Sequence, residues 1–172
     1  MKILFILCSL VVLSGAQYGL NKDMLAQHNN ARVKHQVGVL SIGNPLVANA
    51  TECAKYYAKN NKIDHSCSGN KGYGENLAWY MSSNGPPKQQ DAANKAFSGW
   101  YNEVEFYDYN TGKTKVQGKA IGHFTQVVWK SSQQVGCGTA ENAGEKKTFT
   151  CCLYSPPGNY EGEYTKNVFP IK

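Results

Sequence analysis

The sequence predicts an α+β fold with an antiparallel sheet. Apolar residues recur at helical spacing through the first two thirds of the chain, whereas the segment from Asn110 onward is rich in β-forming residues. Two β-rich runs are joined by the turn-prone stretch "ENAGEK", which indicates an antiparallel hairpin. Helices followed by strands are typical of α+β domains, because a sheet built from hairpins leaves helices to cover its faces.

The N-terminus has the pattern of a secretory signal peptide at residues 1–16. Lys2 precedes an apolar run from Ile3 to Leu13, and small residues surround an expected cleavage after Ala16. The apolar run is too short for a membrane anchor, and no second run of about 18 apolar residues follows. We therefore expect a secreted, extracellular protein whose single domain spans residues 17–172, a length that can bury its own core.

Three helices are expected in the N-terminal part. The first covers residues 21–38, with Asn21 as its N-cap and Gly38 as its stop. The second covers residues 45–61, with Pro45 at its start. Its apolar face consists of Leu46, Ala50, Cys53, Ala54, Tyr57 and Ala58. The third covers residues 91–107, and its apolar face consists of Ala92, Ala96, Trp100, Val104 and Tyr107.

The remaining segments are read as loops and strands. Glycine and serine predict a loop at residues 65–79, and "SSNGPPKQQ" predicts a link at residues 82–90. Strands are expected at residues 123–129, 133–140 and 147–155, the last two forming the hairpin. The tail, residues 156–172, has too many turn-forming residues for a regular element.

Four polar residues stand out against this pattern. Glu103 borders the apolar face of the third helix, and an unpaired buried carboxylate there would be strongly disfavoured. His123 begins the expected strand at residues 123–129, and His65 and Glu75 lie among glycines that permit close approach of the backbone. Taken singly, a hydrogen-bonded histidine or a glutamate at a helix border explains each residue without any site. Spacing alone does not show that the four meet.

Cysteine usage predicts two disulfides and one remaining thiol. Cys8 would leave with the signal peptide, and an oxidising compartment favours pairing among the other five. Cys53 and Cys67 flank the end of the second helix and are close enough in sequence to pair if the chain folds back. Adjacent residues Cys151 and Cys152 point to opposite sheet faces, so only one of them can meet Cys137; the hairpin register permits either.

Charge argues against nucleic acid as a partner. The formal charge of +6 falls to +5 when Lys2 is removed, and the lysines are scattered rather than gathered into a basic stripe. Asn49-Ala50-Thr51 is an N-glycosylation sequon, so we expect Asn49 at the surface if it carries a glycan.

Several stretches together resemble the CAP superfamily of cysteine-rich secretory proteins, antigen 5 and plant pathogenesis-related type 1 proteins. They are, in the family's order, "AQHNNAR", "HSCSGNKGYGENLAW", "WYNEVEFYDY", "GHFTQVVWKSSQQVGCG" and "CLYSPPGNYEGEY". They cover nearly all of the expected mature chain. The sequence of these stretches is similar to that of the fungal secreted members that bind sterols and fatty acids.

The resemblance implies a fold and a site. The family fold is a three-layer α-β-α sandwich with a central antiparallel sheet, and its cleft holds a tetrad that corresponds here to His65, Glu75, Glu103 and His123. Some members bind a divalent metal through the two histidines, which makes Zn²⁺ a candidate cofactor at His65 and His123. The resemblance also favours Cys152 over Cys151 as the partner of Cys137.

The resemblance further implies a small lipid ligand. Fungal members carry a sterol beneath a mobile loop and a fatty acid between two helices, at sites separate from the tetrad. We therefore expect a lipid-binding protein that acts in export or defence. The first alternative is a metal-dependent hydrolase or protease that uses the tetrad, although the motifs H-E-x-x-H and G-x-S-x-G are absent. The second is a non-enzymatic module that contacts an extracellular protein or a membrane surface.

Overall fold

The computed structural model describes residues 2–172, with side chains from Gly15 onward. The expected signal peptide at residues 1–16 therefore lies almost wholly outside the described side chains, and it stays a prediction. Within the described part of the chain, no helix combines the length and apolar composition needed to cross a membrane. The elements are, in order, α1 (Lys2–Lys34), β1 (Ser41–Ile42), α2 (Asn44–Asn60), the 3-10 turn η1 (Ser68–Asn70), β2 (Gly74–Met81), α3 (Gln89–Asn102), the 3-10 turn η2 (Glu103–Phe106), β3 (Tyr107–Asp108), β4 (Lys113–Thr114), α4 (Gly122–Val127), β5 (Gln134–Asn142), β6 (Lys147–Ser155) and α5 (Tyr164–Asn167).

The main sheet has the strand order β1-β5-β6-β2. Strands β5 and β6 form the predicted antiparallel hairpin, in which Cys137 is paired with Cys152, and β2 lies antiparallel to the other side of β6. The short strand β1 is parallel to β5 and is the exception to the expected antiparallel pattern. Strands β3 and β4 form a separate small sheet.

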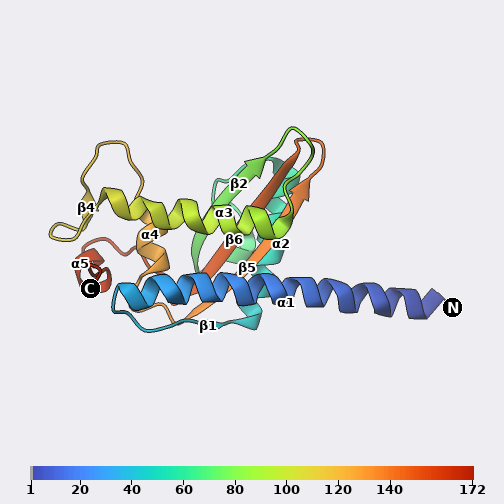
Figure 1. Cartoon of the computed structure of the whole chain (residues 1–172), viewed down its shortest axis with the longest axis horizontal. Helices are drawn as coiled ribbons and strands as arrows, with labels where there is room; N and C mark the ends of the chain where they lie inside the picture. Colours follow the sequence, from blue (N-terminus) through green and yellow to red (C-terminus); the bar gives the residue numbers. More distant parts are fainter. Residues whose placement is uncertain (1) are drawn as a thin grey trace.

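Helices cover both faces of the main sheet, which confirms the α+β class and the sandwich arrangement. Helix α2 packs against β5 and β6 on one face, while α1 and α3 lie side by side across the other (Figure 1). All six apolar residues predicted on the second helix are buried between α2 and the sheet. They pack there with Leu77, Phe149 and Leu153 of the sheet. The side facing α1 and α3 holds the larger core cluster, which includes Met24, Phe97, Trp100, Phe124 and Trp129.

Two glycines allow α2 to approach the sheet closely. A Cβ added at Gly136 would lie 2.3 Å from the backbone nitrogen of Val47, and one at Gly138 would lie 2.4 Å from the Cα of Thr51. Because these neighbours are backbone atoms, a side chain at either position would force the helix away from β5. The alternation "GCG" in the sequence is therefore a packing requirement.

The first helix was predicted with the wrong ends. Helix α1 continues through Asn21, whose side chain does not cap the helix but bonds to β5: its Nδ2 donates to the carbonyl of Cys137 at 3.0 Å, and its Oδ1 accepts from the Cys137 N–H at 2.8 Å. Since β1 pairs only as far as Val135, this amide takes the place of a missing strand residue. At the other end, α1 stops at Lys34, and the residue with the left-handed conformation that commonly follows a helix is Gln36, with a φ of 59°. Gly38, the predicted stop, does not have this conformation.

The third helix and the loop before it also differ from the prediction. Helix α3 ends at Asn102, and Tyr107 belongs to β3 rather than to the helix. The second half of the expected loop at residues 65–79 is strand β2. Gly74 is not a turn residue but a strand residue that allows the side chain of Gln126 to approach the backbone closely. A Cβ at this position would lie 2.0 Å from Oε1 of Gln126.

The prediction of a strand at residues 123–129 is wrong, since Gly122–Val127 is helix α4. Four consecutive residues, Phe124 to Val127, are buried on all sides, so they show no alternation that would favour a strand. The backbone N–H groups of His123 and Phe124 donate to the carboxylate of Glu103 at 2.9 and 3.2 Å. Such a carboxylate at the first turn stabilises a helix against the β preference of its side chains.

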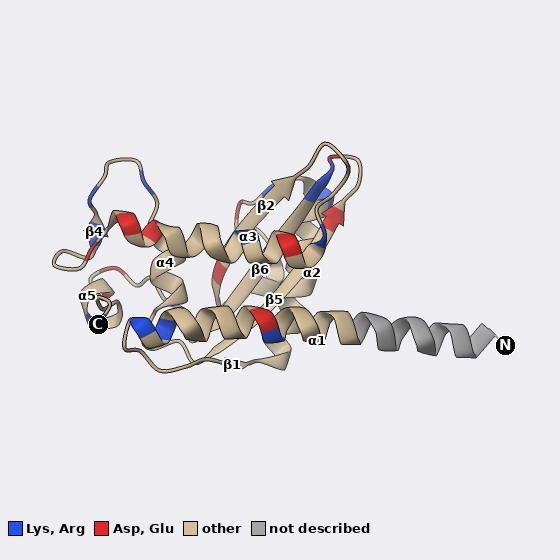
Figure 2. Cartoon of the chain, viewed as in Figure 1, with Lys and Arg blue, Asp and Glu red and all other residues tan. Residues whose placement is uncertain are grey.

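Charged residues of both signs are interspersed over the described ribbon (Figure 2). Lysines follow the segment around β4, and acidic residues lie on the neighbouring turn η2, directly after α3. Charges of both signs interspersed in this way are typical of a solvated surface.

Candidate functional site

Glu75 is the centre of the first histidine–carboxylate pair. Its side chain is 4% exposed and accepts hydrogen bonds from His65 Nδ1 at 2.7 Å and from Asn70 Nδ2 at 2.8 Å. The hydroxyl of Tyr57 donates to both carboxylate oxygens at 3.1 Å. His65 itself is 56% exposed. The pKa of His65 is raised, first by the hydrogen bond to Glu75, while burial acts against it.

Three elements hold this pair in place. Glu75 lies on β2 opposite Leu153 of β6, and Tyr57 lies on α2. His65 lies in the segment after α2 and has a φ of 59°, a left-handed conformation that a non-glycine residue adopts at a cost. The disulfide between Cys53 and Cys67 ties this segment back to α2. The geometry of His65 is therefore set by the cross-link and by Glu75.

His123 and Glu103 form the second pair. Nδ1 of His123 donates to Oε1 of Glu103 at 2.7 Å, while the other carboxylate oxygen accepts the two backbone N–H groups at the start of α4. The imidazole is 31% exposed and stacks on Trp100, with ring centroids 6.1 Å apart. Glu103 is 13% exposed and comes from η2, directly after α3. One carboxylate therefore starts a helix and orients the imidazole on it.

Three of the four residues of the predicted tetrad line one cavity. It has a volume of about 280 Å³, and its walls include His65, Glu75, Asn76, Gly122, His123 and Asn159. Glu103 does not line the cavity and acts there only through His123. The structure therefore brings the two histidine–carboxylate pairs to one hollow from β2, η2, α4 and the segment after α2.

The sequence reading missed two asparagines in this wall. Asn76 is almost fully buried, and its Nδ2 donates to the carbonyl of His123 at 3.1 Å and to the hydroxyl of Tyr154 at 3.2 Å. Asn159 accepts from the Thr125 hydroxyl at 2.6 Å and donates to the carbonyl of Gly122. Both residues lie inside stretches that carry the family resemblance, but a single asparagine in a loop or strand does not by itself predict a site.

The metal-binding capacity of the cavity rests on two imidazoles. Each Nδ1 is bonded to a carboxylate, an arrangement typical of metal-ligating histidines, and this leaves each Nε2 as the candidate ligand atom. Zinc takes three or four protein ligands in most sites. Among the residues that the structure describes, no group of three or more His, Cys, Asp or Glu side chains is placed to hold a metal ion. Zn²⁺ therefore fits the two histidines only with ligands from outside this set.

The cysteines pair as expected. Disulfides join Cys53 to Cys67 and Cys137 to Cys152, and the thiol of Cys151 is buried on the opposite sheet face. Burial, with Glu75 nearby, raises the pKa of Cys151 well above its ordinary value, so the thiol is a poor nucleophile. Glycosylation at Asn49 stays a prediction; this residue is half-buried within α2.

A separate apolar hollow lies between α1, β1 and α2. Its volume is about 360 Å³, which is within the range of small-molecule sites. Tyr18, Ile42 and Val47 supply apolar wall, and Gln17, Asn21 and Asn44 supply polar groups. Tyr18 is 68% exposed, so an aromatic ring stands open to solvent at this hollow.

Comparisons of sequence place these features among known proteins. The sequence model described as "Cysteine-rich secretory protein family" (CAP) matches residues 25–154. The yeast (Saccharomyces cerevisiae) protein PRY2 is 36% identical over 156 residues, a match that covers 87% of this chain and 41% of the yeast protein. Pathogenesis-related protein PR-1 of Medicago truncatula is 40% identical over 114 residues, covering 66% of this chain and 62% of that protein. The chain thus spans less than two thirds of these two relatives.

Comparisons of structure agree with the fold. The structure of BmVAL-1 has a TM-score of 0.70 and 25% identity, and the match covers 89% of this chain and 82% of that one. A structure described as NaASP2 with Zn²⁺ has a TM-score of 0.64 and 22% identity, covering 88% and 85%. At 22% identity, the similarity to the NaASP2 structure supports the fold alone.

Proposed function

The chain belongs to the cysteine-rich secretory protein (CAP) family, and from this premise we propose that it is a secreted protein that binds and carries a small lipid, a sterol or a fatty acid. The fungal members that the sequence resembles have this property, and the similarity to a yeast protein over 87% of the chain supports the comparison. Export of lipid or defence against a host or competitor is the setting in which such a carrier would act.

The apolar hollow between α1, β1 and α2 is the observation that carries the proposal. Lipid binding is driven by removing apolar surface from water, at roughly 25 cal/mol for each Å². Ile42, Val47 and Tyr18 provide such surface. The exposed amide of Asn44 beside them suits the polar end of a lipid. The cavity of the two histidines is lined by imidazole, carboxylate and amide groups, which an acyl chain would desolvate without compensation.

Binding of palmitate and cholesterol to the delipidated exported protein tests the proposal. The test variants are Tyr18→Ser and Val47→Gln, which place polar groups in the hollow, and we expect each to weaken binding about tenfold. The matched control is Val116→Ser, because Val116 is also an exposed apolar residue but lies beyond β4, away from the hollow. Equal binding by all four proteins would reject this hollow, and no binding by the wild type would reject the function.

A metal-dependent hydrolase or protease is the second candidate. The orientation of both histidines by carboxylates favours it, since a bound Zn²⁺ would supply a polarised water for attack on a carbonyl group. In that case His65 and His123 would hold the ion. Titration with Zn²⁺, combined with peptide and ester hydrolysis by the wild type and by His65→Ala and His123→Ala, separates the candidates. Hydrolysis that needs Zn²⁺ and is lost in both variants would establish the enzyme.

A non-enzymatic module that contacts an extracellular protein or a membrane surface is the third candidate. Native mass spectrometry of the exported protein would report a bound lipid, a bound metal, a glycan at Asn49 and cleavage after Ala16 in one measurement. A protein that leaves the cell without lipid and takes up neither lipid nor metal would favour this module over the other two.

A further inference from the structure

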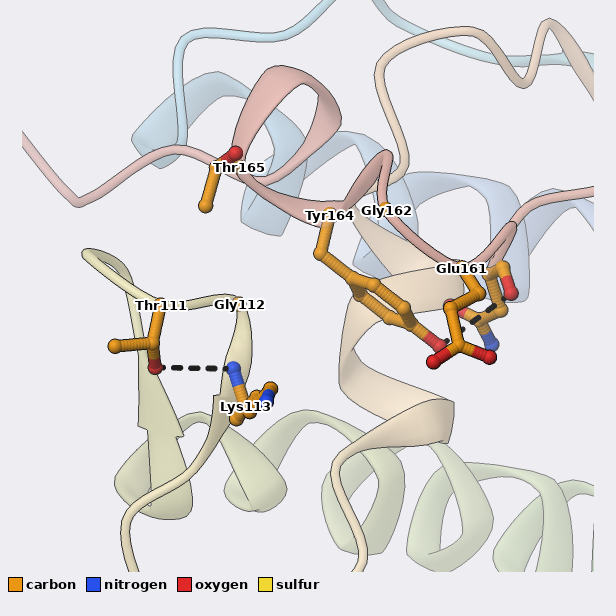
Figure 3. A pocket seen from close by; sticks show the side chains of 8 residues that line it. Thr111, Gly112, Lys113, Glu161, Gly162, Tyr164 and Thr165 are labelled. Atoms are coloured by element: carbon orange, nitrogen blue, oxygen red, sulfur yellow. Dashed lines mark hydrogen bonds between the residues drawn. The ribbon is translucent and has the colours of Figure 1, made fainter.

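A third hollow of the described structure belongs to neither site above. It has a volume of about 470 Å³ and lies between the turn that joins β3 to β4 and the segment that leads into α5. Figure 3 shows Thr111 and Lys113 on one side, Glu161 on the other, and the ring of Tyr164 between them. Thr165 and Asn159 complete the polar wall.

The two walls are held together before any ligand binds. Gly112 is buried at the join, where a Cβ would lie 2.8 Å from the Cβ of Tyr164, and its φ of 71° favours glycine. Asn159 is fixed to α4 by its bonds with Thr125 and Gly122. Asn167, at the end of α5, accepts from the hydroxyl of Ser131 at 2.8 Å. The hollow is therefore preformed, which lowers the entropic cost of binding.

The side chains around the hollow have unused hydrogen-bonding capacity. Within the described residues, the ammonium group of Lys113 and the carboxylate of Glu161 take part in no ion pair, and the hydroxyl of Thr165 has no bonded partner in the protein. By contrast, Lys166 and Glu163 on the same segment pair with each other at 2.8 Å. The hollow thus offers one positive group, one negative group and hydroxyls.

Tyr164 offers a fixed aromatic surface. Its ring meets Trp129 edge to face, with centroids 5.5 Å apart and an interplanar angle of 90°, and its hydroxyl donates to the carbonyl of Asn159 at 3.4 Å. The ring also lines the hollow, so one part of it is packed and another part is available. Pyranose sugars bind proteins through such surfaces, since their C–H faces stack on aromatic rings while their hydroxyls bond to the polar groups around them.

We propose that this hollow binds a short, uncharged oligosaccharide, with one pyranose ring on Tyr164 and its hydroxyls bonded to Lys113, Glu161 and Thr165. A lipid would desolvate these polar groups without compensation. A ligand with a single charge would be attracted by one of Lys113 and Glu161 and repelled by the other, so its charge would add little affinity. An extended peptide would need a strand edge to pair with, and β3 and β4 are two residues long each. A neutral polyol satisfies donors and acceptors of both kinds.

Asn159 suggests the direction of a longer chain. It lines this hollow and also the cavity of His65 and His123, so the two spaces share one wall residue. A second or third sugar unit that leaves Tyr164 across Asn159 enters the histidine cavity, whose imidazole, amide and carboxylate groups are also hydrogen-bonding partners. We therefore expect trisaccharides to bind more tightly than monosaccharides.

Calorimetry and NMR titration with N-acetylated chitotriose and with laminaritriose test the proposal, with tri-alanine as a peptide probe. Binding of at least one trisaccharide is expected, with shifts at the amides of Thr111–Lys113 and Glu161–Thr165. We expect Glu161→Gln, Lys113→Met and Thr165→Val to weaken it about tenfold each. Tyr164→Phe keeps the ring and should bind within about twofold of the wild type.

Glu163→Gln is the matched control, because it removes a carboxylate from the same segment but outside the hollow. It should leave the affinity unchanged, as should Val47→Gln in the lipid hollow, so failure here and failure of the lipid proposal are distinguishable. Three results would overturn the proposal. The first is that neither trisaccharide binds at 10 mM, a concentration about ten times a millimolar Kd. The others are tighter binding of tri-alanine and an equal loss of affinity in Glu163→Gln and Glu161→Gln.

Discussion

Replacing His28 with glutamine should make the folded protein less sensitive to acid. His28 is fully buried on α1, where its Nδ1–H donates to the carbonyl of Met24 at 2.7 Å and its Nε2 accepts from the hydroxyl of Tyr154 at 2.8 Å. Burial lowers the pKa of His28 from 6.5 to about 4. A second proton has to enter at Nε2, which then no longer accepts the hydrogen bond from the Tyr154 hydroxyl. Asn76 cannot replace this acceptor, because its Nδ2 is itself a donor to the Tyr154 oxygen.

The size of the effect follows from linkage. Since the folded pKa lies below the unfolded value, the contribution of His28 is fully present above pH 6.5 and is lost as the pH falls toward 4. The difference between these two pKa values, at 1.36 kcal/mol for each unit of pKa, corresponds to about 3 kcal/mol of the free energy of unfolding. This is a large part of the 5–15 kcal/mol that stabilises a typical domain.

Urea unfolding at pH 4 to 8 measures this contribution. The wild type should lose about 3 kcal/mol more than His28→Gln between pH 7.5 and pH 4. His35, whose pKa is also lowered by burial, adds to the acid sensitivity of both proteins and cancels in the difference. His65→Gln is the control of opposite sign: the raised pKa of His65 stabilises the fold below pH 6.5, and this is lost as the pH rises through the folded value. Parallel curves for wild type and His28→Gln, or an NMR titration midpoint of His28 above 6, would refute the reasoning.

Three further predictions concern packing and the histidine cavity. Arg32→Met removes a buried guanidinium that donates to four backbone carbonyls, so unfolding free energies in urea should fall by at least about 3 kcal/mol, and a loss under about 1 kcal/mol would contradict this role. Gly136→Ala should lower the free energy of unfolding by about 3 kcal/mol, because the added Cβ meets the backbone of α2. The control Gly144→Ala should change it by less than about 0.5 kcal/mol, because only a side-chain oxygen 3.6 Å away is near. Similar melting temperatures for the two variants would count against the contact. Glu103→Gln should weaken the bonds at the start of α4 and speed amide hydrogen exchange at His123, and unchanged exchange would show that the carboxylate is dispensable there.

Packing faces were the most predictable part of the fold. The six apolar residues expected on the second helix are its buried residues, because a helix that covers one sheet face must repeat its apolar side chains every three or four positions. The β5–β6 hairpin was predictable for a similar reason, since its strands follow one another in the sequence and are joined by a four-residue, turn-rich link. Asn21 was not predictable as a partner of Cys137, because the two are far apart in the chain and local chemistry equally permits a helix cap.

Helix α4 shows why the candidate site resists prediction from local pattern. The stretch from His123 to Trp129 has the composition of a strand, yet the residues that follow His123 are all buried and therefore show no alternation. Its conformation is decided by Glu103, twenty residues earlier, which accepts the first free N–H groups and the imidazole proton together. A strand would turn alternate side chains to opposite faces and release the backbone bond that His123 shares with Glu103. The carboxylate that selects the helix is therefore the same group that aims His123 at the cavity, so fold and site are specified here by one contact and should be lost together.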